Sequence, residues 1–139
     1  MSEPANIALI QRLYDAFSRG DVATILSNLT PDVEWIFEGP SIVPFTGKRH
    51  GIEETKGFFM ALATTQSGMK LTTDEFVAQG DRVATYGRYT GTVTATGKKF
   101  DSPVGHFFQI KDGKVARFVN MGDTAAYVEA YTASSSARA

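Results

Sequence analysis

Cysteine is absent from the 139-residue chain. Its absence excludes disulfides, thiolate metal ligands and a cysteine nucleophile. Concentrated positive charge is missing too, because the net charge is −1 and no basic run stands out. Nucleic acids and anionic membranes are bound by concentrated positive surfaces, so we expect neither as a partner.

Long apolar runs are also missing. None approaches the roughly 18 residues that a membrane-spanning helix requires, and the N-terminal sequence lacks the positive and apolar regions of a secretory signal. We therefore predict a cytoplasmic protein. The two histidines are far apart in the sequence and show no ligand-type spacing, so we expect no metal. No phosphate-cradling glycine motif is present, so we expect no cofactor.

Aromatic residues, by contrast, are plentiful: ten Phe, five Tyr and one Trp. Such side chains fill a core, line a pocket or cover a dimer face. The length and a hydrophobic content of 42% predict one globular domain with one core. We place this domain at residues 1–131 and predict that the small, polar segment 132–139 is a disordered tail.

Apolar residues follow a helical period in much of the first half of the chain. This period predicts a first helix that Ser2 caps and Gly20 ends, and a short second helix that Asp21 caps. The strand that follows is indicated by alternation that puts Val33, Trp35 and Phe37 on one face. The elements predicted here are helices at 3–19, 22–29 and 52–62, a strand at 32–38 and a loop at 39–51.

In the second half the apolar period changes from 3.6 to 2, which is typical of strands. The pair Asp112–Gly113 tolerates positive φ and predicts a hairpin turn. Asp123 is a suitable cap for a last helix. Gly87, Gly91 and Gly105 lie inside predicted strands, where glycines often mark bulges or bends. The elements predicted here are strands at 70–78, 82–93, 100–110 and 115–121 and a helix at 124–131.

Helices that come first and a meander of strands after them indicate the α+β class. Long antiparallel strands need one covered face, and the early helices can cover it. A sheet bent over helices leaves a hollow between them. We therefore expect a curved sheet around an apolar pocket.

The order of elements and several short motifs resemble the SnoaL-like polyketide cyclases and the ketosteroid-isomerase-like proteins of the nuclear transport factor 2 superfold. The resemblance covers about residues 5–131. It implies a curved, mixed and mostly antiparallel sheet wrapped around three N-terminal helices, a cone-shaped α+β barrel with a short C-terminal helix. The motifs are Tyr14-Asp15-Ala16-Phe17 with Gly20-Asp21, Leu29-Thr30-Pro31-Asp32-Val33-Glu34-Trp35, Gly47 and Gly51 before Phe58-Phe59, His106-Phe107-Phe108, Asp112-Gly113-Lys114-Val115, and Asp123.

The same resemblance nominates three catalytic residues. Asp123 corresponds to a cyclase general acid/base that moves a proton next to a carbonyl, although capping the last helix also explains it. His106 lies at a position that can donate to an oxyanion or hold Asp123 in place, and is otherwise a core histidine. Tyr14 lies at a pocket position that stabilises an enolate oxygen, and is otherwise a core residue of the first helix.

Aromatic and apolar residues are expected to bind the substrate around these three. Glu38 is interpreted as a solvated residue at the rim of the pocket and His50 as an exposed loop residue. The expected substrate-binding residues are Trp35, Phe37, Phe59, Phe108 and Met121.

Three functions are consistent with this sequence. The first is a cofactor-independent cyclase or isomerase that acts on an apolar carbonyl compound by proton transfer. The second is a domain of the same fold that binds a small apolar molecule without catalysis. The third is a dimerisation module. The family usually pairs through the open face of the sheet, so we predict a homodimer in which outward aromatics such as Phe107 and Phe118 form the contact.

Overall fold

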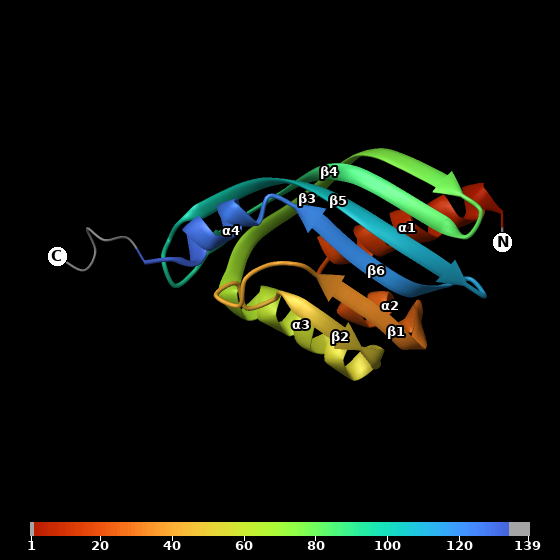
Figure 1. The fold of residues 1–139 in the computed structure, drawn as a ribbon, viewed down its shortest axis with the longest axis horizontal. Coiled ribbons are helices and arrows are strands. Elements are labelled where there is room, and N and C mark those ends of the chain that lie inside the picture. Colours follow the sequence, from red (N-terminus) through yellow and green to blue (C-terminus); the bar gives the residue numbers. More distant parts are fainter. Residues whose placement is uncertain (1, 134–139) are drawn as a thin grey trace.

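A computed structural model describes residues 2–133 of the chain. The strands form one sheet in the order β2-β1-β6-β5-β4-β3, and this sheet curves over the N-terminal helices (Figure 1). The elements are α1 (Glu3–Ser18), α2 (Val22–Ser27), β1 (Leu29–Phe37), β2 (Gly47–His50), α3 (Gly51–Thr65), β3 (Gln66–Gln79), β4 (Arg82–Val93), β5 (Lys99–Lys111), β6 (Lys114–Gly122) and α4 (Thr124–Tyr131).

Helix α1 begins where the sequence predicts. The Oγ of Ser2 accepts a hydrogen bond from the Ala5 N–H at 3.2 Å, which satisfies one of the free donors of the first turn. The buried stripe of α1 includes Leu9, Ile10 and Leu13, and it packs on β3 and β4. Burying such a stripe is the main source of stability for a helix of this length.

The sheet is mixed, as expected. Strand β1 runs parallel to β6, whereas every other neighbouring pair in the described sheet is antiparallel. The sheet is not closed, since β2 and β3 are its two edges. Helix α3 packs on β1 and β2, and α4 packs on β4 and β5. The α+β class and the curved sheet predicted from the sequence are confirmed.

The predicted loop at 39–51 is wrong only at its end, because residues 39–46 contain neither helix nor strand. Its last part forms β2, which pairs antiparallel with β1, so that Trp35 lies opposite Arg49. A four-residue strand of Gly, Lys, Arg and His shows no alternation of apolar and polar residues. Only the neighbouring strand reveals it, because pairing is a property of the sheet and not of the segment.

The expected bends differ among the three strand glycines. Gly87 lies at a bulge, because the β3–β4 register shifts between Thr73 and Glu75, just beyond the Thr73–Gly87 pair. A Cβ at Gly87 would stand 1.9 Å from the carbonyl oxygen of Thr72. At Gly91 a Cβ would stand 2.7 Å from the ring of Phe100. At Gly105 the nearest atom would be 3.5 Å away, so no close approach requires glycine there.

Phe118 contradicts its predicted place on the outer face. It is 3% exposed and belongs to the core cluster, because strand parity puts it on the same side as Asn120, which is also buried. Phe107 is half-buried. The homodimer stays a prediction.

No helix within residues 2–133 is long and apolar enough to cross a membrane. The predicted tail lies outside the described residues from residue 134 onward.

Replacing Gly87 with Ala is expected to lower the free energy of unfolding by about 2–3 kcal/mol, because the new methyl group meets the β3 backbone and the sheet must shift. Gly105→Ala is the matched control in the neighbouring strand, and we expect a change within about 0.5 kcal/mol. Urea unfolding of both variants measures the difference. Equal stability of the two variants would contradict the close approach at Gly87.

Candidate functional site

The hollow between the sheet, α1 and α3 contains a cavity. The space available to the centre of a water molecule is about 70 Å³, several times the roughly 10–15 Å³ that one water needs. Four of the five expected substrate-binding residues line it: Trp35, Phe37, Phe59 and Phe108.

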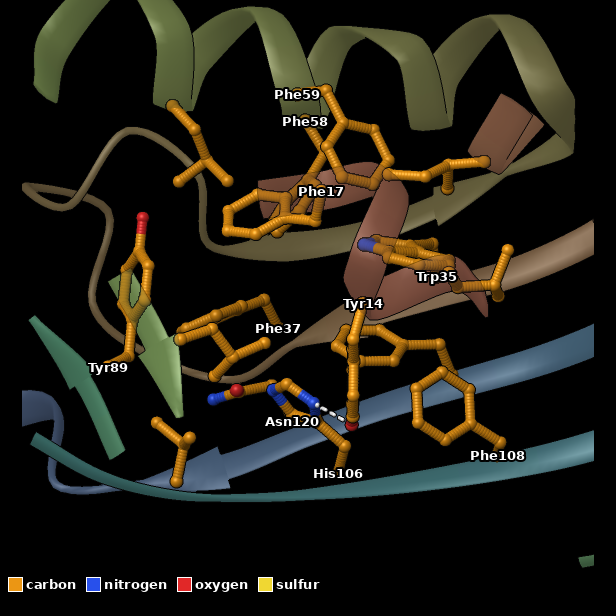
Figure 2. A pocket seen from close by; sticks show the side chains of 16 residues that line it. Tyr14, Phe17, Trp35, Phe37, Phe58, Phe59, Tyr89, His106, Phe108 and Asn120 are labelled. Carbon is orange, nitrogen blue, oxygen red and sulfur yellow. Dashed lines mark hydrogen bonds between the residues drawn. The ribbon is translucent and has the colours of Figure 1, made fainter. Parts of the chain in front are cut away.

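Tyr14 and His106 meet inside this cavity (Figure 2). The Tyr14 hydroxyl lies 2.8 Å from His106 Nδ1 and 2.7 Å from Thr85 Oγ1. A tyrosine hydroxyl has one proton to donate. It therefore donates to one of these neighbours and accepts from the other, so the three side chains form one hydrogen-bonded chain.

The sheet register explains how these groups come together. Thr85 of β4 lies directly opposite His106 of β5, and His106 lies directly opposite Asn120 of β6. All three are buried. They form a polar row across three strands of a face that is otherwise mainly apolar, and Tyr14 reaches this row from α1.

Burial sets the protonation of this chain. Desolvation lowers the pKa of His106 to about 4 and outweighs the opposing effect of the nearby Asn120 amide. Desolvation also raises the pKa of Tyr14, against a smaller lowering by the hydrogen bond to Thr85. A charged group is costly in an apolar surrounding. At neutral pH the pair is therefore a neutral imidazole and a neutral phenol.

Asn120 is the pocket residue that sequence reasoning missed. Its side chain is 1% exposed and lines the cavity, and neither Nδ2 nor Oδ1 has a hydrogen-bond partner among the described residues. Trp35 Nε1 is likewise buried without a described partner. Parity gave no usable signal, because Asn120 shares the parity of Phe118, which is predicted from the sequence to lie on the outer face.

The other two predicted site residues lie elsewhere. Asp123 is exposed and does not line the cavity; it caps α4, where Oδ1 accepts a hydrogen bond from the Ala125 N–H at 3.1 Å. The expected convergence of Asp123 with Tyr14 and His106 is therefore not seen, and its catalytic role stays a prediction. Met121 is 52% exposed and is also absent from the lining. Both residues follow Asn120, where β6 leaves the cavity.

Glu38 and His50 are exposed, as the sequence indicates. Glu38 follows the end of β1, and His50 precedes α3, where its backbone N–H donates to Glu54 Oε1 at 2.8 Å. Neither lines the cavity. Among residues 2–133 no group of three His, Cys, Asp or Glu side chains is placed to hold a metal ion.

Comparisons with known proteins agree with this fold. An NTF2-like protein from Burkholderia pseudomallei K96243 is 30% identical, with a TM-score of 0.87 over 96% of this chain and 100% of that chain. The structure of TerC co-crystallized with polyporic acid is 33% identical, with a TM-score of 0.83 over 91% and 98%.

An NTF2-like protein from Burkholderia thailandensis E264 is 28% identical, with a TM-score of 0.84 over 95% and 99%. Comparison with curated proteins finds no match. The model of the SnoaL-like domain matches residues 10–118. With most of its length matched, the chain belongs to the SnoaL-like domain family.

Proposed function

We propose that the cavity binds a small, largely apolar carbonyl compound and that His106, oriented by Tyr14, transfers a proton next to its carbonyl group without a cofactor. The observation that carries the proposal is the Tyr14–His106 hydrogen bond inside a cavity with aromatic walls. Membership in the SnoaL-like family supports a reaction of the cyclase or isomerase type.

Among the described residues that line the cavity, no carboxylate is present. Proton transfer within the cavity therefore falls to Tyr14 and His106, the titratable groups nearest its polar row. When His106 carries its proton on Nδ1 and donates to Tyr14, the Tyr14 hydroxyl donates to Thr85 and Nε2 carries no proton. In this tautomer the imidazole can act as a base through Nε2.

The step balances with no further reactant. Nε2 of His106 takes a proton from the carbon beside the carbonyl, the C–H electron pair forms the new C=C bond, and the carbonyl π electrons move to oxygen. The enolate then lies beside an imidazolium, and each charge offsets the other in the apolar pocket. The imidazolium returns the proton to carbon or oxygen. Alternatively, the enolate carbon attacks a second carbonyl in the same molecule, and the imidazolium gives its proton to the resulting alkoxide.

The relative TerC supports the class of ligand. TerC was co-crystallized with polyporic acid, a flat hydroxyquinone that carries aromatic rings. A cavity walled by Trp35, Phe37, Phe59 and Phe108 offers such rings apolar and edge-to-face contacts. A site that binds such a molecule without catalysis would use the same aromatic walls. Proton exchange distinguishes catalysis from binding alone.

Deuterium exchange of the CH₂ protons of β-tetralone, followed by NMR in D₂O, is the measurement of proton transfer. We expect the protein to accelerate exchange, and Tyr14→Phe to slow the catalysed rate by about 10- to 100-fold, because the phenol no longer orients the imidazole. Tyr86→Phe is the matched control, since Tyr86 is 50% exposed. Binding without acceleration by the wild type would favour the retention function.

Asp123→Asn separates the two candidate bases. Because Asp123 lies outside the cavity lining, we expect the catalysed exchange of β-tetralone to stay within about twofold of the wild type, whereas His106→Gln lowers it at least tenfold. A large loss in Asp123→Asn with little change in His106→Gln would make Asp123 the base and overturn the assignment to His106.

The pKa of His106, about 4 in the folded protein against 6.5 for an ordinary histidine, makes stability depend on pH. The unfolded chain binds the extra proton between these values, so the stabilisation is complete above pH 6.5 and is lost as the pH falls towards 4. Between pH 7.5 and pH 5 this residue should reduce the free energy of unfolding by about 2 kcal/mol.

Urea unfolding at the two pH values measures this loss. In His106→Gln the pH dependence should shrink by about 2 kcal/mol, whereas His50→Gln removes the other histidine of the chain and serves as the control. The same pH dependence in wild type and His106→Gln would show that His106 is not held neutral by burial.

A further inference from the structure

Asn120 is a polar side chain whose burial lowers the stability of the fold. It is 1% exposed, it lines the cavity, and both atoms of its amide lack a hydrogen-bond partner among the described residues. An unsatisfied buried group costs about 1–3 kcal/mol. A leucine of similar size would avoid this cost, so stability does not account for an asparagine at this position.

Figure 2 shows the Asn120 amide on the far side of the His106 ring from the Tyr14 hydroxyl. The amide nitrogen offers two donors and the amide oxygen two acceptor sites. Even an amide that directs one atom towards His106 therefore keeps both a donor and an acceptor for a molecule in the cavity. The donor and the acceptor lie side by side in one plane. A flat ligand with an acceptor next to a donor on one edge can therefore bind both at once.

We propose that Asn120 selects the ligand by binding a hydroxyl or N–H group and an adjacent carbonyl oxygen on one edge of a flat, unsaturated molecule. The hydroxyl or N–H donates to Oδ1, and the carbonyl oxygen accepts from Nδ2. The aromatic walls of the cavity fit the flat body of such a molecule. Trp35 Nε1 supplies a donor for a second ligand oxygen, because Trp35 is 4% exposed and Nε1 has no hydrogen-bond partner among the described residues. The inference narrows the ligand class of the proposed function but concerns binding alone.

The neutral pair 2-quinolone and N-methyl-2-quinolone tests this recognition, because the methyl group removes the donor next to the carbonyl and leaves the flat ring system. Isothermal titration calorimetry of the wild type should show tighter binding of 2-quinolone by about 10- to 100-fold. In Asn120→Leu the two compounds should bind within about threefold of each other. Equal affinities in the wild type would overturn the proposal.

Asn6→Leu is the matched control. Asn6 is also 1% exposed, but it lies outside the cavity lining and donates to the Gly80 carbonyl oxygen at 3.1 Å. We expect this variant to keep the wild-type preference. Loss of the preference in Asn6→Leu as well as in Asn120→Leu would mean that destabilisation, and not the Asn120 amide, controls binding, and would overturn the proposal.

A second measurement does not depend on how the variants fold. In ¹⁵N-labelled wild type, 2-quinolone should shift the side-chain NH₂ resonances of Asn120, and N-methyl-2-quinolone should shift them much less. Equal shifts by both compounds would contradict the bidentate contact. The binding tests and the deuterium-exchange test can fail separately. A protein that prefers 2-quinolone but does not accelerate exchange would support recognition by Asn120 and contradict only the proposed catalysis.

Discussion

The register of β4, β5 and β6 is the constraint on which the site depends. Thr85, His106 and Asn120 are direct cross-strand partners and all point towards the helices. Because side chains alternate between the two faces of a strand, a slip of one residue would turn His106 outward and bring a neighbour inward. The apolar residues on the same face hold the register, since the same slip would expose Val104 and Phe108.

Tyr14 connects this row to the helical layer. Its ring packs against Phe76, His106 and Phe108, while its hydroxyl satisfies two polar side chains of the sheet. A buried hydroxyl without partners would be costly, so the phenol and the row stabilise each other. The same contacts fix the position of the imidazole, which is the preorganisation that proton transfer needs.

The two ends of the polar row differ in how fully their polar groups are hydrogen-bonded. At the Thr85 end the side chains of Thr85, Tyr14 and His106 form one hydrogen-bonded chain. At the Asn120 end the amide is left with free donors and acceptors inside the cavity. A closed network favours rigidity and an open one favours a ligand. A molecule bound at Asn120 would thus lie next to a histidine that is hydrogen-bonded to Tyr14 on its other side.

The sequence determined most of the fold, because its signals are local. The caps at Ser2, Asp21 and Asp123 and the Asp112–Gly113 turn lie where the sequence puts them, since each depends on a few neighbouring residues. Alternation predicted the strands for the same reason. The resemblance nominated Tyr14 and His106, which the fold brings within hydrogen-bonding distance, and their catalytic role stays a prediction. Strand β2 and the inward position of Phe118 could not be read, because both depend on which strands become neighbours.

Tertiary structure alone decided which polar residues share the cavity. Asp123 and Asn120 are three positions apart, yet the strand keeps Asn120 over the cavity and ends before Asp123, which turns to the first N–H groups of α4. Thr85 and Asn120 carry no motif; they gain a role only because register places them on either side of His106. Local pattern fixes the elements, whereas the chemistry of a site belongs to groups that are distant in sequence and adjacent only after the sheet has formed.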